Sequence, residues 1–167
     1  MGFFSNLFGK NDKTAKENSE KLHLSKNVGV PYNNDLIKIL RKDHENLINE
    51  FGKIAKAAQN KKYKTLKQYM KTFKVNLEIH NYSEKIQLFL YLKNYYKDSE
   101  YEDFIEDMSK SAEEIYKDVF NFLKKYENIE FNDQYLGLFK SELEAVGRIL
   151  QSRIEVEESE LYTLYKK

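Results

Sequence analysis

The stretch NDLIKILRKDHENLINEFGKIAKAA, residues 34–58, decides the fold of this 167-residue chain. Its apolar residues recur at intervals of three and four, which is the spacing of one face of an α-helix. Asn34, a residue type that caps helix N-termini, stands just before them. The stretch therefore predicts a long amphipathic helix. The residues of its apolar stripe are Ile37, Leu40, Leu47, Phe51, Ile54 and Ala58.

Three further segments repeat this pattern. They run from about residue 62 to 96, from Ser99 to about Tyr126, and from a cap at Asn132 to about Leu164. The chain has one proline and six glycines, too few for the many turns of a β-sandwich or barrel. Four long amphipathic segments with short connections predict an all-α, antiparallel up-down four-helix bundle over residues 34–167.

Residues 1–33 are predicted to form a flexible N-terminal tail, because residues 10–27 are polar and lysine-rich without periodicity. A short apolar group at its start could contact a membrane or a partner, although a frayed terminus is the preferred interpretation. No transmembrane run or secretory signal is present in the sequence, so a cytoplasmic location is expected. The apolar group consists of Phe3, Phe4, Leu7 and Phe8.

Composition limits the chemistry that the chain can perform. It has no cysteine, which excludes disulfides, thiolate metal sites and cysteine nucleophiles. It has three histidines, of which His23 lies in the predicted tail, so any metal site must combine histidine with carboxylates. The net charge of +1 predicts no particular partner. No phosphate-binding loop or metalloprotease motif is present, and a non-enzymatic role is therefore favoured.

Polar residues interrupt three of the four apolar stripes at positions where leucine would normally lie. His44 interrupts the first stripe, His80 and Glu84 the second, and Arg153 and Glu157 the fourth. The third stripe stays apolar, with Ala112 near its middle. Burying such groups without partners costs several kcal/mol each, so they must satisfy one another or a ligand.

Two interpretations of this polar group stay open from spacing alone. Two imidazoles and two carboxylates, from His44, His80, Glu84 and Glu157, are a suitable set of ligands for a divalent metal ion. Alternatively, Arg153 pairs with Glu157 and Glu84, and the histidines donate to carboxylates in a network without metal.

The same residues resemble the hemerythrin-like (HHE cation-binding) family, whose four-helix bundle holds a dinuclear iron centre. Asp43-His44-Glu45 matches the Asp-His-Glu signature of the family's first helix. The resemblance covers about residues 34–165 through three motifs in order. The residues matching the second-helix motif are Leu77, His80, Glu84, Leu88 and Phe89. Those matching the fourth-helix motif are Leu150, Ile154, Glu157, Glu158, Leu161 and Tyr162.

The departures from the family pattern concern one of its two metal positions. The resemblance implies a metal site at His44, His80, Glu84 and Glu157. At the family's third- and fourth-helix histidines this chain has Ala112, Tyr116 and Arg153. A guanidinium supplies positive charge there but cannot ligate a metal. The resemblance therefore implies a degenerate site with one ion or none.

The implied function is a metal-binding sensor or storage module, not a di-iron oxygen carrier. Iron is the expected ion, with zinc and manganese as alternatives, and a small diatomic molecule is a possible ligand. An oxidase or peroxidase would need an open coordination position and a substrate cavity, and the sequence indicates neither.

A second resemblance suggests a different class of function. The run Val146-Gly147, Leu150, Arg153 and Glu157-Glu158 is similar to the regulator-of-sigma-D family of anti-sigma proteins. That family forms a metal-free helical bundle and binds a protein partner, as a bacterial transcription regulator does. Because the Asp43-His44-Glu45 signature fits it less well, the metal-free interaction protein is the alternative function.

Charge is separated along the chain. Between Phe51 and Leu77 there are eight lysines and no acid, and between Asp98 and Asp118 there are nine acids against two lysines. A basic patch could meet nucleic acid or an acidic partner. No nucleic-acid-binding motif accompanies these lysines, so a solvated face against or near the acidic segment is the preferred interpretation.

Overall fold

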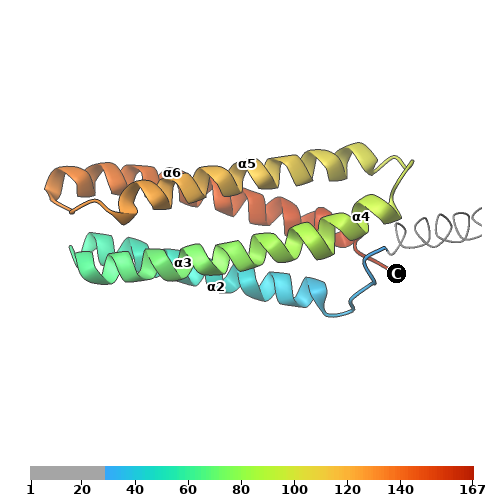
Figure 1. The fold of residues 1–167 in the computed structure, drawn as a ribbon, viewed down its shortest axis with the longest axis horizontal. Helices are drawn as coiled ribbons and strands as arrows, with labels where there is room; N and C mark the ends of the chain where they lie inside the picture. The colour runs from blue at the N-terminus through green and yellow to red at the C-terminus, as the bar shows by residue number, and fades with distance from the viewer. Residues whose placement is uncertain (1–28) are drawn as a thin grey trace, which may run out of the picture. The chain divides into compact units, whose positions relative to one another are not determined.

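The structure, a computed structural model, describes residues 29–167. Its regular elements within this range are all helices, and the four long ones run antiparallel (Figure 1). The prediction of an all-α four-helix bundle is therefore confirmed. Most of the predicted tail, including His23 and the apolar group at residues 3–8, lies outside the described residues.

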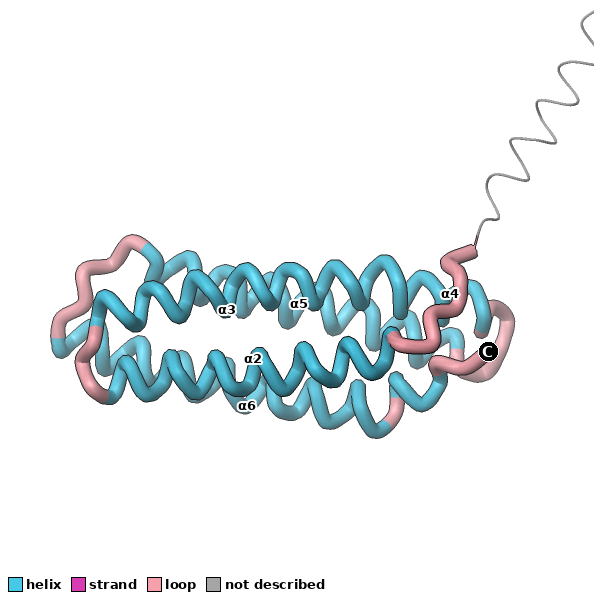
Figure 2. Tube along the Cα trace, turned by 90° about the horizontal axis from the view of Figure 1, so that it is seen from below, coloured by secondary structure: helices cyan, strands magenta, loops and turns pink. Residues whose placement is uncertain are grey.

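The four corners of the bundle are formed by four continuous helical rods. The first two are α2 (Leu36–Gln59) and α3 (Tyr63–Ser83), and α3 continues through a π-helical segment (Glu84–Phe89) into α4 (Leu90–Tyr95). The others are α5 (Glu102–Glu127) and α6 (Asp133–Ser159), which a short 3-10 helix (Leu161–Leu164) follows. Helices α2 and α5 each pack against both α3 and α6 (Figure 2).

The helix starts differ in part from the predicted ones. Asn132 is the predicted cap, and its Oδ1 accepts a hydrogen bond of 2.9 Å from the Tyr135 backbone N–H. Helix α2 begins one residue later than predicted, with Asp35 rather than Asn34 at its N-cap. Helix α5 begins at Glu102, because Ser99 belongs to the preceding turn, where its hydroxyl donates to the Tyr96 carbonyl at 2.6 Å.

The π-helical segment keeps one row of side chains directed into the core. His80, Glu84, Leu88 and Leu92 are all buried and are spaced four residues apart. An α-helix repeats every 3.6 residues, so successive steps of four would rotate this row away from the core. The wider π turn corrects the drift, and such turns often lie at functional sites. It begins at Glu84, one of the predicted site residues.

Two apolar clusters fill the interior, and the predicted polar positions lie between them. One cluster lies toward the α2–α3 turn and includes Ile54, Phe73 and Phe139. The other lies toward the chain's C-terminus and includes Leu88 and Leu161. In each helix that carries them, the buried polar residues fall in sequence between the residues of the two clusters. The bundle thus contains a buried polar layer between two apolar halves.

None of the helices in residues 29–167 has the length and apolar character needed to cross a membrane.

The lysine-rich stretch does not lie against the acidic segment, as the preferred interpretation of the sequence expected, because the helices run antiparallel. The acidic residues of α5 face the later part of the α3–α4 rod, through Lys85–Glu113 at 2.7 Å and Lys93–Glu106 at 2.8 Å. Lys74, within the lysine-rich stretch, instead pairs with Glu127 at 3.3 Å. The lysine-rich and acidic stretches therefore lie toward opposite ends of the bundle.

A close contact between α2 and α6 predicts opposite effects for two glycine substitutions. A Cβ at Gly147 would lie 2.9 Å from Phe51 Cε1, whereas one at Gly52 would meet nothing within 4 Å. Alanine gains about 1 kcal/mol of helix propensity at either site, but overpacking costs about 1–3 kcal/mol. We expect Gly52→Ala to raise the melting temperature by about 2–4 °C and Gly147→Ala to lower it. Equal increases for both variants in calorimetry would contradict this packing.

Candidate metal centre

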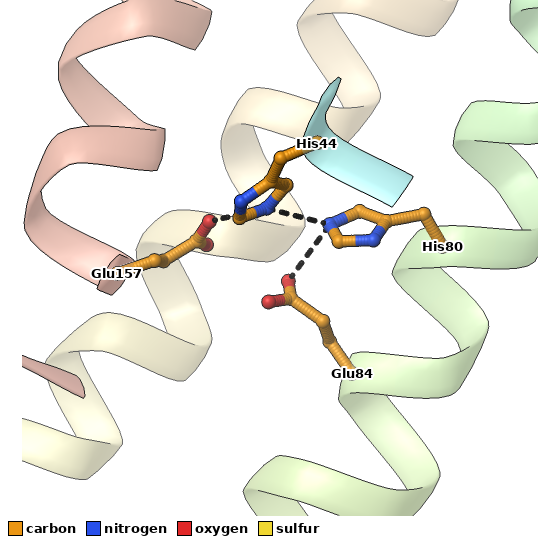
Figure 3. A group of neighbouring side chains, drawn as sticks. All are labelled: His44, His80, Glu84 and Glu157. Atoms are coloured by element: carbon orange, nitrogen blue, oxygen red, sulfur yellow. Dashed lines mark hydrogen bonds and ion pairs between the residues drawn. The ribbon is translucent and has the colours of Figure 1, made fainter. Parts of the chain in front are cut away.

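Four predicted site residues converge in the polar layer (Figure 3). His44 comes from α2, His80 from α3, Glu84 from the start of the π-helical segment, and Glu157 from α6. All four are buried, and one potential ligand atom from each lies within 4.8 Å of the others. Three separate helical rods thus bring two imidazoles and two carboxylates together.

The spacing of these atoms matches the first coordination shell of a small metal ion. His44 Nε2 lies 3.2 Å from His80 Nε2 and 3.3 Å from Glu157 Oε2. His80 Nε2 lies 3.7 Å from Glu84 Oε2. Ligands placed tetrahedrally at metal distances of 2.0–2.2 Å are separated by about 3.4 Å. These three separations are close to that value, and all four ligand atoms lie within 4.8 Å of one another, so the residues present fit a metal ion once the farther atoms move inward.

The outer nitrogen of each imidazole faces a further carboxylate. His44 Nδ1 hydrogen-bonds to Glu158 Oε1 at 2.8 Å, and Glu158 is held by Arg41. His80 Nδ1 lies 3.8 Å from Asp43 Oδ2, too far for a direct hydrogen bond. Carboxylates behind metal-bound histidines fix the tautomer that leaves Nε2 free to ligate. Asp43 and Glu158 thus have supporting positions that their place in the sequence motifs did not reveal.

Tyr162 adds a hydroxyl to the polar layer that the helical spacing of the stripes does not predict. Its hydroxyl donates to Glu84 Oε1 at 2.8 Å and lies 3.2 Å from His44 Nε2. It stands in the 3-10 helix after α6, where helical periodicity no longer applies. Since Tyr162 holds one oxygen of Glu84, the other oxygen remains directed at His80. The only sequence signal for it was its place in the fourth-helix motif.

Arg153 lies on the far side of Glu157 from the histidines. Its Nε donates to Glu157 Oε1, while Glu157 Oε2 faces His44. Its Nη1 lies 3.5 Å from the Met108 sulfur, and its Nη2 has no hydrogen-bond partner among the described residues. Glu157 is therefore held between an imidazole and a guanidinium. The predicted ion pair with Glu157 is present, whereas Glu84 pairs with Tyr162 instead of Arg153.

Ala112 and Tyr116, which the resemblance placed at a second metal position, contribute no ligand atom to the polar layer. Ala112 packs against the C-terminal apolar cluster. The Tyr116 hydroxyl lies 3.5 Å from Glu78, and both residues line a surface pocket between α3 and α5.

Burial and neighbouring charges give the two histidines opposite pKa shifts. Burial lowers the pKa of His80 to about 4, and the adjacent His44 charge adds to this effect. Burial also opposes charging of His44, but hydrogen bonds with Glu157 and Glu158 outweigh it and raise its pKa. The buried environment thus favours a positive charge on His44 over one on His80.

The two carboxylates also differ. Burial raises the pKa of Glu84 to about 8, and the nearby Glu157 charge contributes in the same direction. Burial would raise the pKa of Glu157 too, yet His44 and Arg153 lower it overall. The Arg153 side of the layer thus stabilises one ionised carboxylate.

Comparison with known proteins supports a cation-binding domain. The sequence model of the hemerythrin HHE cation binding domain matches residues 35–165, which include every residue of the polar layer. No curated protein and no solved structure matches the chain significantly.

The buried ion pair predicts a large cost for removing Arg153. Arg153→Met leaves the buried Glu157 charge without its guanidinium, and breaking such pairs costs about 3–5 kcal/mol. Arg148, on the same helix, pairs with Glu144 at the same i,i+4 spacing but is exposed. We expect Arg148→Met to change the free energy of unfolding by less than about 0.5 kcal/mol. Urea denaturation of metal-free protein measures both, and equal effects would contradict the assigned pairing.

Proposed function

Because the chain belongs to the hemerythrin HHE cation-binding family, we propose that it binds one metal ion through His44, His80, Glu84 and Glu157. The observation that carries this proposal is the convergence of four buried ligand atoms within 4.8 Å. A burial this complete is unfavourable for ionisable groups unless a charge or a ligand compensates for it.

The proposed number of ions rests on Arg153. In a dinuclear site, each oxygen of a bridging carboxylate faces one metal. Here one oxygen of Glu157 faces His44, and the other accepts a hydrogen bond from the Arg153 guanidinium. A guanidinium provides a fixed positive charge and cannot act as a ligand. Ala112 offers no donor atom on that side, so the proposed site holds one ion.

The donor set narrows the choice of metal. Imidazole nitrogens with carboxylate oxygens suit iron(II), zinc and manganese. We propose iron, as the resemblance implies, with zinc and manganese as alternatives. When bound, the ion would supply a Lewis-acidic centre at which a small diatomic molecule could coordinate. His44 and His80 would hold it by Nε2, and Glu158 would orient the His44 ring through its hydrogen bond with Nδ1.

We propose a sensing or storage role for the domain, as the family resemblance implies. Two surface pockets lie between α3 and α5, one beside Lys67 and Glu127 and the other beside Tyr82 and Tyr116, and residues of the polar layer line neither of them. The alternative function is a metal-free interaction protein, in which Arg153, Tyr162 and the carboxylates satisfy the layer by themselves.

Metal stoichiometry tests the proposed function. We expect elemental analysis of protein loaded anaerobically with iron(II) to give one ion per chain, and His80→Ala to lose it. His23→Ala, in the predicted tail, is the matched control and should retain the ion. Two ions per chain would contradict the role of Arg153, and none in the wild type would favour the metal-free interaction protein.

A second prediction concerns the carboxylate behind His44. Glu158→Gln weakens the orientation of the ring without removing a ligand, and such changes typically cost about 10–100-fold in metal affinity. Glu155→Gln, on the same helix, alters an exposed carboxylate that contacts only Gln151 among the described hydrogen bonds. Competition titration with a chelating dye should show weaker binding for the first variant and unchanged binding for the second.

A further inference from the structure

The Tyr162 hydroxyl lies among the ligand atoms of the candidate metal centre. It is 3.2 Å from His44 Nε2, the nitrogen proposed to bind the ion, and 2.8 Å from Glu84 Oε1. Two atoms bound at a right angle to one ion, each about 2.0–2.2 Å from it, are separated by about 2.8–3.1 Å. The hydroxyl oxygen therefore already has the spacing of a neighbouring ligand, in addition to its hydrogen bond with Glu84.

The ring of Tyr162 is held in this orientation by its neighbours. The residue is 3% exposed, and its ring stacks on the His44 imidazole with the centroids 5.7 Å apart and the planes inclined by 12°. The Arg41 guanidinium lies over the same ring, 5.8 Å from its centroid. These contacts keep the hydroxyl directed at His44 and Glu84, which is the preorganisation that a ligand requires.

We propose that Tyr162 is a fifth ligand of the ion and that it binds iron(III) through its phenolate oxygen. This inference rests on the proposed function, because it requires an ion between the histidines and the two carboxylates. Binding forms an iron–oxygen bond and breaks the O–H bond of Tyr162, and the proton is released to solvent, as it is when other protein ligands bind metals. No electron is transferred, because the iron enters as iron(III). Phenolate oxygen is an established ligand of iron in proteins.

The charges of the polar layer favour iron(III) for this bond. Glu84 and Glu157 balance a divalent ion between them. Iron(III) carries one positive charge more, and the loss of one proton from Tyr162 compensates it in a region where an unbalanced charge is costly. The other charged groups next to the ligands are two cations and two anions, which cancel: Arg41, Arg153, Asp43 and Glu158.

The same balance predicts that Tyr162 responds to the charge of the ion. With zinc or iron(II), a phenolate would leave the layer with an excess negative charge, so the hydroxyl stays protonated and donates to Glu84. With iron(III), it exchanges this hydrogen bond for the metal. The set of ligands would thus depend on the oxidation state of the iron.

Optical spectroscopy of the full-length chain tests the fifth ligand. Iron(III) is supplied as its nitrilotriacetate complex, the excess is removed, and the bound iron is counted by elemental analysis. We expect the wild type to show a phenolate-to-iron(III) charge-transfer band in the visible spectrum, with tyrosinate ring vibrations in resonance Raman spectra excited within it. Tyr162→Phe should lose both signals and retain iron at the remaining ligands. Tyr165→Phe is the matched control, because Tyr165 is also buried but its hydroxyl accepts from the Asn33 backbone N–H at 2.8 Å.

The outcomes separate this inference from the proposed function. A wild type that binds iron(II) but not iron(III), or that binds iron(III) without the band, overturns the fifth ligand alone. A wild type that binds neither ion contradicts the proposed function as well. These results need no variant, so they decide the question even if Tyr162→Phe does not fold. A band that Tyr162→Phe retains, or that Tyr165→Phe also loses, likewise overturns the assignment to Tyr162.

Metal selectivity distinguishes a ligand from a structural partner. If Tyr162 only held Glu84, Tyr162→Phe would weaken the binding of iron(III) and zinc alike, by the roughly 10–100-fold that is typical of groups behind the ligands. As a ligand of iron(III), Tyr162 contributes more, so we expect the variant to lose iron(III) affinity by a larger factor than zinc affinity. Competition titrations with chelators measure both factors, and equal values would contradict the inference.

Discussion

The structure depends on the contact between His44 and His80 in the middle of the bundle. Two imidazoles with their Nε2 atoms 3.2 Å apart, flanked by two buried carboxylates, replace apolar side chains at a central layer. Removing such groups from water is costly, and the cost is recovered only if each polar atom finds a partner. Several neighbouring features provide these partners: the π-helical segment directs Glu84 inward, Tyr162 holds it, and Glu158 fixes His44.

Arg153 makes the layer asymmetric. It satisfies one oxygen of Glu157 with a fixed charge, so this side needs no cation, whereas the histidine side retains four converging ligand atoms. The Met108 sulfur lies next to the Arg153 guanidinium. A thioether can accept a weak hydrogen bond from the guanidinium, but it is a poor ligand for a hard metal ion. In the proposed one-ion site, the Arg153 guanidinium supplies the positive charge beside this oxygen of Glu157.

Helical periodicity predicted much of the fold and the candidate site. The interruptions at His44, His80, Glu84, Arg153 and Glu157 predicted the buried polar layer, and all five side chains are buried. Periodicity could not predict the π-helical segment, because a row spaced by four is compatible with a straight helix until burial is known. It also missed Tyr162, which lies beyond the end of α6.

Partners of the site residues required tertiary structure. Asp43 precedes His44 in sequence but faces His80 on the neighbouring helix, since adjacent residues of a helix point about 100° apart. The pairing of Arg153 with one oxygen of Glu157 rather than with Glu84 likewise depends on the rotation of α6 about its axis. The spacing of four residues showed only that Arg153 and Glu157 share a helix face.

The most direct test of a one-metal layer is an anomalous difference map from crystals of the protein loaded with iron or zinc. A one-ion site predicts a single peak at about 2.0–2.2 Å from His44 Nε2, His80 Nε2 and the two carboxylates, with Arg153 still bonded to Glu157. A second peak on the Arg153 side of Glu157, or no peak in this layer, would contradict it.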